Sequence, residues 1–253
     1  LLSFTLNLQG GSPLGYGNHG WINSTFDSLV NLREDYLTRL EKILNKSNEL
    51  GMVVILGYFY FGQDEQLKDE QAVVNAVDNI TNWILQKGYK NILIEINNEC
   101  DVKYDHTILQ PQRVNELIKR VQEISGNKLL VSTSYGGNKI PSSEVIAASD
   151  FVLLHGNGVN DPKRIEEMVA LVRQSESYSA KPILFNEDDH FDFDKESYNF
   201  LSAAESYASW GYFDFRMKGE DYTAGFQSVP VDWTISSDRK KAFFNKLKEI
   251  TGY

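Results

Sequence analysis

The chain has 253 residues, of which 42% are hydrophobic and 24% charged, proportions that exclude a largely disordered polypeptide. Its 25 basic and 35 acidic residues give a net charge of −10, which would repel nucleic acid and leaves a neutral ligand unaffected. A single cysteine, Cys100, excludes an internal disulfide framework and a cysteine-based zinc ribbon, and no apolar run reaches the roughly 20 residues of a membrane span.

Short apolar runs recur along the chain, and most are continuous rather than alternating, as expected for parallel strands covered by helices. They span residues 3–8, 52–60, 91–97, 128–133, 151–155, 182–186 and 212–216. Amphipathic stretches with helical spacing lie between and after them, over residues 33–50, 68–86, 111–124, 142–148, 162–173, 195–209 and 238–250. The pair Asp161-Pro162 fits a helix N-cap followed by proline, and Gly51 and Gly88 fit left-handed residues that end helices.

This alternation predicts an α/β fold, most simply a (β/α)8 TIM barrel with one strand unaccounted for. No linker rich in proline, glycine and serine interrupts it, so we expect a single domain over residues 1–253. The chain opens inside a strand-like run, which suggests that the natural N-terminus and any signal peptide lie upstream. The alternative is an open doubly wound sheet, but neither G-x-G-x-x-G after a strand nor G-x-x-x-x-G-K-S/T is present.

Two of the strand-like runs end in an Asn-Glu pair, Asn98-Glu99 and Asn186-Glu187. The two glutamates lie three strand-helix units apart, so a closed barrel would bring them together at its carboxyl-terminal mouth, where barrel enzymes place their catalytic groups. Two converging carboxyls can cleave a glycosidic bond, one as a proton donor and the other as a nucleophile or base. The sequence therefore predicts a glycosidase.

The run IEINNEC at residues 94–100 resembles the fourth-strand signature of clan A retaining glycoside hydrolases, especially family 5 cellulases and mannanases. That signature is approximately Tyr/Phe-Glu-Ile/Leu-x-Asn-Glu-Pro, and Cys100 stands here in place of the proline. Residues 182–187 resemble the seventh-strand pattern of the same clan. By this count the strand missing from the chain is the first, which agrees with a chain that begins inside a strand.

The resemblance implies that Glu99 is the general acid/base and Glu187 the nucleophile of a retaining mechanism that needs no cofactor. It implies that Asn98 hydrogen-bonds the sugar 2-hydroxyl and that His155, at the end of the sixth strand of the family, belongs to the site. The run His155-Gly156-Asn157 departs from the His-x-Tyr of family 5. A secreted or periplasmic protein acting on a neutral glycan is also implied, with the sugar, the linkage and endo or exo action left open.

Aromatic side chains after strands and in loops are further candidates for binding sugar, because a flat ring can cover the apolar face of a pyranose. Trp21 and Trp233 lie in polar loops, and Tyr60 and Tyr135 follow strands, where packing is the alternative role. Glu95 lies within an apolar strand, and we expect it to be a buried structural carboxylate paired with Lys or Arg.

Two other functions remain open at this stage. A barrel that binds carbohydrate without cleaving it would keep the fold and lose the chemistry. A metal-dependent barrel hydrolase or sugar isomerase is disfavoured because the chain has only four histidines. The run Asp188-Asp189-His190 contains metal-binding residue types, but adjacent residues seldom converge on one ion, so we expect a solvated loop or sugar contacts there.

Overall fold

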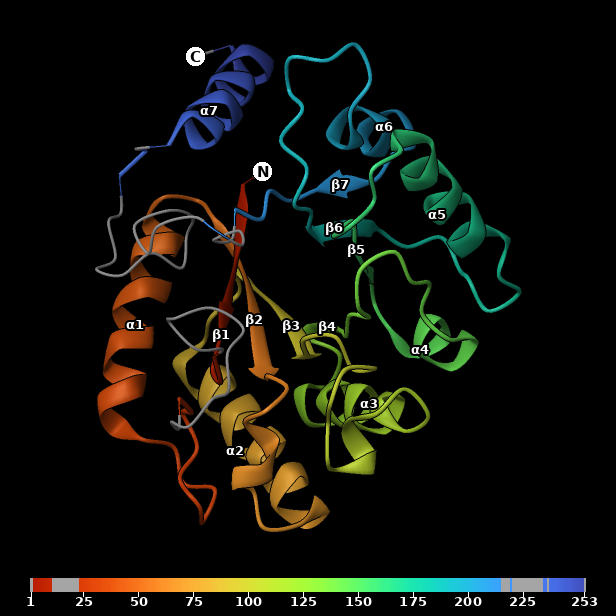
Figure 1. Ribbon diagram of the computed structural model, residues 1–253. Helices are drawn as coiled ribbons and strands as arrows, with labels where there is room; N and C mark the ends of the chain where they lie inside the picture. The colour runs from red at the N-terminus through yellow and green to blue at the C-terminus, as the bar shows by residue number, and fades with distance from the viewer. Residues whose placement is uncertain (1, 11–22, 215–218, 220–233, 236, 253) are drawn as a thin grey trace.

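A computed structural model describes residues 2–10, 23–214, 219, 234–235 and 237–252 (Figure 1). The strands are β1 Ser3–Asn7, β2 Val53–Phe59, β3 Ile92–Asn97, β4 Leu130–Ser132, β5 Val152–His155, β6 Ile183–Glu187 and β7 Ser209–Trp210. The α-helices are α1 Glu34–Glu49, α2 Glu70–Lys87, α3 Val114–Ser125, α4 Ser143–Ala148, α5 Pro162–Gln174, α6 Asn199–Glu205 and α7 Asp238–Thr251. Short 3₁₀ helices follow β2 and β3, at η1 Asp64–Gln66 and η2 Thr107–Leu109.

The strands pair in chain order, and every ladder between them is parallel. One sheet has the order β1-β2-β3-β4 and the other the order β5-β6-β7. A doubly wound sheet would reverse its strand order at a switch point, and the described strands do not. This sequential order confirms the barrel-type α/β fold over the doubly wound alternative. Among the described residues, no ladder joins β7 back to β1.

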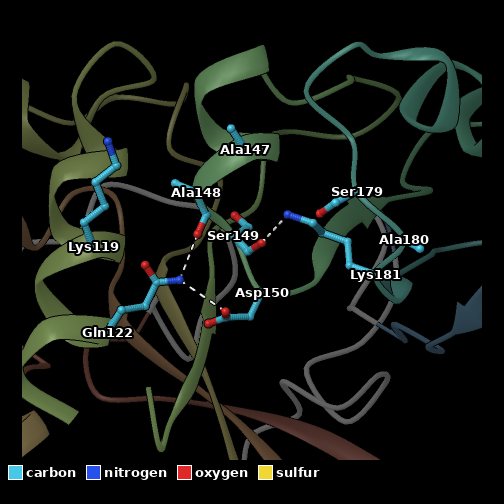
Figure 2. Close-up of a pocket in the computed structure, with 9 residues that line it drawn as sticks. All are labelled: Lys119, Gln122, Ala147, Ala148, Ser149, Asp150, Ser179, Ala180 and Lys181. Carbon is cyan, nitrogen blue, oxygen red and sulfur yellow. Dashed lines mark hydrogen bonds between the residues drawn. The ribbon is translucent and has the colours of Figure 1, made fainter. Parts of the chain in front are cut away.

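Hydrogen bonds join the two sheets between β4 and the residues just before β5, a junction that we call the seam. Asp150 accepts from the backbone nitrogen of Val131 at 2.8 Å and donates its own backbone N–H to the Val131 carbonyl at 2.9 Å. Figure 2 shows Gln122 donating to Asp150 and to the carbonyl of Ala148, and the Lys181 ammonium reaching this seam. The open cavity in that figure lies at the amino-terminal ends of β5 and β6, where conservation in barrels usually serves stability rather than catalysis.

Buried apolar side chains form two clusters, one on each side of the seam. The first surrounds β1 to β4 and includes Leu56, Ile94 and Val131; the second surrounds β5 and β6 and includes Leu154 and Phe185. Helices α1, α2 and α3 cover the first sheet, and α5 and α6 cover the second (Figure 1). Polar side chains at the carboxyl-terminal ends of the two sheets are therefore supported by two separate apolar clusters.

The helix signals of the sequence are confirmed. The Asp161 carboxylate accepts from the backbone nitrogen of Lys163 at the start of α5, and Pro162 is the first helical residue. Gly88 ends α2 with a φ of 73°, and Gly51 follows α1 with a φ of 66°. Within the described parts of the chain, no helix combines the length and the apolar character needed to cross a membrane.

The last strand and the helix before it differ from expectation. Strand β7 is Ser209–Trp210, and α6 ends at Glu205, because Tyr207 adopts a φ of 54° that no helix continues through. Residues 212–214, where we predicted the start of a strand, are neither helix nor strand. The Tyr212 ring is stacked on Phe243 of α7, with 4.4 Å between the ring centroids. Residues 215 and 216 of that predicted strand lie outside the described residues.

Candidate active site

The two glutamates lie at the carboxyl ends of strands in different sheets. Glu99 follows the last residue of β3 by two positions, and Glu187 is the last residue of β6. The ladder between β5 and β6 pairs Leu154 with Phe185 and then His155 with Glu187, so Asn186 is an extra residue in β6. Such a bulge changes the direction of the side chain that follows it. Here it brings Glu187 into register with His155.

His155 lies between the two glutamates. Its Nδ1 is 3.2 Å from Glu99 Oε1 and 3.8 Å from Glu187 Oε2, and its side chain is fully buried. The distance between Glu99 Oε1 and Glu187 Oε2 therefore cannot exceed the sum of these two distances. As expected from the sequence, the two glutamates meet at the carboxyl-terminal ends of the strands, with one carboxyl from each sheet.

Two amide side chains orient Glu187. Asn98 Nδ2 donates to Glu187 Oε1 at 3.0 Å, and Asn157 Nδ2 donates to Glu187 Oε2 at 3.2 Å. Both oxygens of this carboxyl thus accept an N–H, an arrangement that suits an ionised carboxylate. The resemblance implied that Asn98 bonds a sugar hydroxyl. It placed Asn157 where family 5 has the tyrosine of His-x-Tyr, but it did not predict the hydrogen bond from Asn157 to Glu187.

The charges around His155 are strongly coupled. Burial lowers the pKa of His155, but Glu187, Glu99 and Glu95 outweigh it and raise that pKa to about 9, so the ring is positively charged at neutral pH. The pKa of Glu187 is raised above its ordinary value, mainly by burial, and the charge of His155 and the amides of Asn157 and Asn98 oppose this rise only in part. The positively charged ring of His155 therefore interacts electrostatically with three carboxyl groups, those of Glu187, Glu99 and Glu95.

Glu95 has a different partner from the expected Lys or Arg. It is fully buried, as predicted, and its Oε1 accepts the Ser134 hydroxyl at 2.5 Å. Burial raises its pKa to about 7, and the nearby His155 is the positive charge that opposes this rise. The apolar strand around Glu95 predicted its burial, but its partner comes from a residue 39 positions away, which no local pattern could indicate.

The remaining aromatic candidates are separated by the structure. Tyr60 and Tyr135 are each 7% exposed, and the Tyr135 hydroxyl accepts the backbone N–H of Ser142. Packing is therefore their observed role, and their contact with sugar stays a prediction. Trp21 and Trp233 lie outside the described residues.

The run after β6 is not the solvated loop that we expected. Asp188 is fully buried and accepts from Trp210 Nε1 at 2.8 Å and from Asn199 Nδ2, so it ties β7 and α6 to the loop of Glu187. His190 Nδ1 lies 3.1 Å from Asp188 and 3.0 Å from Asp189, and these carboxylates raise its pKa to about 9. One ligand atom from each of Asp188, Asp189 and His190 lies within 4.8 Å of the other two, so these adjacent residues do converge, contrary to our expectation from the sequence. The Asp188 oxygens already accept N–H groups from His190, Trp210 and Asn199, which supports a role in holding the loop.

Comparison with solved structures decides what this fold is. A glycoside hydrolase from Bacteroides vulgatus, provisionally assigned as such, matches 98% of the chain with a TM-score of 0.63 at 14% identity. The fold is that of the family 5-like glycoside hydrolase barrels. A Prevotella bryantii endo-β-mannanase/endo-β-glucanase matches 96% of the chain and 41% of its own length, with a TM-score of 0.59 at 13% identity.

A third similar structure is a family 5 lichenase from Caldicellulosiruptor sp. F32 in complex with cellotetraose. It matches 96% of the chain and 80% of its own length, with a TM-score of 0.55 at 13% identity. The chain spans about half the length of the Bacteroides protein, of which 52% is matched. Neither a protein-family model nor a curated protein sequence matches the chain. At these identities the likeness establishes the barrel fold.

Proposed function

We propose that this protein hydrolyses O-glycosidic bonds with retention of configuration, with Glu187 as the nucleophile and Glu99 as the general acid/base. The observation that carries the proposal is the pairing of two carboxyls from opposite sheets around His155. Retaining enzymes hold their carboxyl groups about 5–5.5 Å apart and inverting enzymes about 6.5–9.5 Å apart. The upper limit that His155 sets on the distance between Glu99 Oε1 and Glu187 Oε2 is compatible with the spacing of retaining enzymes, which supports the proposal.

The surroundings of the two carboxyls suit different roles. Glu187 accepts amide N–H groups on both oxygens, which favours the ionised form and holds it in one orientation for attack. Glu99 bonds His155 through one oxygen, and its side chain is 18% exposed, so it can reach the leaving-group oxygen of a bound glycan. The positive charge of His155 stabilises the ionised form of Glu187 in a buried site.

The reaction then proceeds in two displacements. An oxygen of Glu187 bonds the anomeric carbon as the bond to the leaving oxygen breaks, and the proton of Glu99 passes to that oxygen. Glu99, now ionised, takes a proton from water, whose oxygen attacks the anomeric carbon and releases Glu187. Each group ends in its starting protonation state, so no cofactor is consumed.

A neutral, β-linked glycan is the substrate class that best fits the chain. A net charge of −10 gives no attraction to an anionic polymer. The similar lichenase holds cellotetraose, and the similar Prevotella enzyme acts on mannan and glucan, by their descriptions. The single-domain organisation over residues 1–253 and a secreted or periplasmic location belong to the same proposal.

The test is a panel of β-linked oligosaccharides that includes cellotetraose and manno-oligosaccharides, with the anomer first formed identified by NMR. We expect the β-anomer first, and loss of turnover by at least about 1,000-fold in Glu99→Gln and Glu187→Gln. Glu123→Gln, an exposed glutamate of α3, is the matched control and should keep full activity.

The two roles can be separated by adding azide. In Glu187→Ala azide should attack the anomeric carbon directly and give the α-glycosyl azide, whereas in Glu99→Ala it should replace water and give the β-glycosyl azide. Formation of the α-anomer by the wild type, or full activity in both glutamine variants, would contradict the proposal. Binding of a glycan without turnover would favour a carbohydrate-binding barrel instead.

A further inference from the structure

Glu99 has a backbone conformation that its surroundings must hold in place. Its φ is 50°, in the left-handed region that non-glycine residues enter only at a cost of about 1–2 kcal/mol. A residue stays in that region only when neighbouring groups determine its position. At Glu99 the conformation sets the direction of the candidate acid, so whatever fixes the backbone also places the acid.

Ser134 fixes this backbone at two successive positions. Its hydroxyl oxygen accepts the backbone N–H of Glu99 at 2.9 Å, and its carbonyl accepts the backbone N–H of Cys100, also at 2.9 Å. On the other side, the Tyr104 hydroxyl donates to the carbonyl of Asn98 at 2.6 Å. Of these contacts, only the one through the Ser134 hydroxyl reaches the N–H of the left-handed residue itself.

Glu95 in turn orients the Ser134 hydroxyl. A serine hydroxyl has one proton, and at Ser134 that proton is donated to Glu95 Oε1 at 2.5 Å. The lone pairs of the same oxygen are then directed toward the Glu99 N–H. Glu95 is fully buried, and its hydrogen-bonded connection to the backbone of Glu99 runs through the Ser134 hydroxyl.

We infer that Glu95 and Ser134 form a positioning pair that aims the carboxyl of Glu99 at the leaving-group oxygen. This inference rests on the proposed function, since it gives Glu99 the role of acid. The pair also accounts for a carboxylate inside an apolar strand, which would otherwise cost stability without return. The groups that face Glu95 electrostatically are His155, Glu187 and Glu99, so its charge acts on the same site.

Leaving-group dependence tests the pair, because a misplaced acid matters only when the leaving oxygen needs a proton. Each variant is assayed on cellotetraose, or on the oligosaccharide that the wild type prefers, and on the 2,4-dinitrophenyl glycoside of the same sugar. In Ser134→Ala we expect kcat on the oligosaccharide to fall about 10- to 100-fold with little change in KM. Formation of the glycosyl-enzyme from the dinitrophenyl substrate, measured as the burst of dinitrophenolate, should stay near the wild-type rate.

The chain offers a matched control and a conservative variant. Ser132 lies on β4 two residues before Ser134 and is also buried, and its hydroxyl donates to the Thr133 carbonyl, so Ser132→Ala should behave as the wild type. Glu95→Gln keeps a hydrogen-bond acceptor for Ser134 and should keep most of the activity, whereas Glu95→Leu should resemble Ser134→Ala. If Ser134→Ala does not fold, Ser134→Cys, a poor donor and acceptor of similar shape, replaces it.

Amide hydrogen exchange over residues 98–102 gives a readout that does not depend on turnover. It should be faster in Ser134→Ala and Glu95→Leu than in the wild type and in Ser132→Ala. Unchanged exchange, or equal losses on both classes of substrate, would overturn the positioning pair while leaving the proposed function intact. A wild type that cleaves no glycan would overturn the proposed function, and the exchange measurement would still decide whether Glu95 and Ser134 fix the backbone.

Discussion

The amide of Asn157 offers the most direct way to perturb the candidate nucleophile without changing its charge. Asn157→Ala removes one of the two N–H donors to Glu187, the bond of 3.2 Å to Oε2. Hydrogen bonds to charged groups contribute about 1.5–3 kcal/mol, and 3.2 Å is at the long end of the usual range, so the lower value applies. Since 1.4 kcal/mol corresponds to a factor of ten, we expect kcat/KM to fall about 10-fold.

The same substitution should move the pH profile in a defined direction. The bond from Asn157 lowers the pKa of Glu187, so its loss raises that pKa further above the ordinary value. The nucleophile must be ionised in the free enzyme, and the acidic limb of kcat/KM against pH should therefore move to higher pH. Asn98→Ala should shift the limb in the same direction, because its bond of 3.0 Å to Oε1 acts in the same way.

The measurement is kcat/KM between about pH 4 and pH 9 for the wild type and both variants. Asn160→Ala is the control, because Asn160 lies in the same loop and contacts His190 rather than Glu187. An acidic limb that stays in place or moves to lower pH in Asn157→Ala would refute the reasoning. The same loss of kcat/KM in Asn160→Ala would show that the loop, and not the hydrogen bond, controls activity.

Three further predictions concern stability. The pKa of His155 is about 9 in the folded protein and about 6.5 in an unfolded chain, so its contribution is complete below about pH 6.5 and is lost as the pH rises to about 9. The melting temperature should fall across this window more steeply in the wild type than in His155→Asn, and equal slopes by calorimetry would contradict this. In Gly156→Ala the new methyl would lie 2.3 Å from Asp188 Oδ2, and we expect a loss of about 1–3 kcal/mol in urea unfolding, which unchanged stability would disprove. Lys181→Met removes the hydrogen bonds from the ammonium to the carbonyls of Ser149 and Ile146, of 2.6 and 2.8 Å, and should lower the midpoint of urea unfolding. Lys119→Met, on the same cavity, is the control and should leave the midpoint unchanged. Similar midpoints for the two variants would argue that these bonds at the seam do not stabilise the fold.

Much of the fold could be predicted from local pattern. The runs that became β1 to β6 and the stretches that became α1 to α5 and α7 differ from expectation by a few residues at their ends. Continuous apolar runs and helical spacing are properties of neighbouring residues, so they are readable before the chain folds. The last strand was predicted wrongly, at residues 212–216 instead of Ser209–Trp210. The Tyr212 ring packs on Phe243 of α7, 31 residues later in the chain, and a local pattern cannot show such a distant partner.

The sequence by itself determined which carboxyls stand at strand ends, because Asn98-Glu99 and Asn186-Glu187 each follow an apolar run. Only the tertiary structure decided how they are oriented and what surrounds them. The bulge at Asn186 depends on pairing with β5, and the amide of Asn157 reaches Glu187 across that ladder. Glu95 finds its partner in Ser134, two residues after the end of β4. Hydrogen bonds and charge coupling require groups within a few ångströms, and only folding brings such distant residues that close.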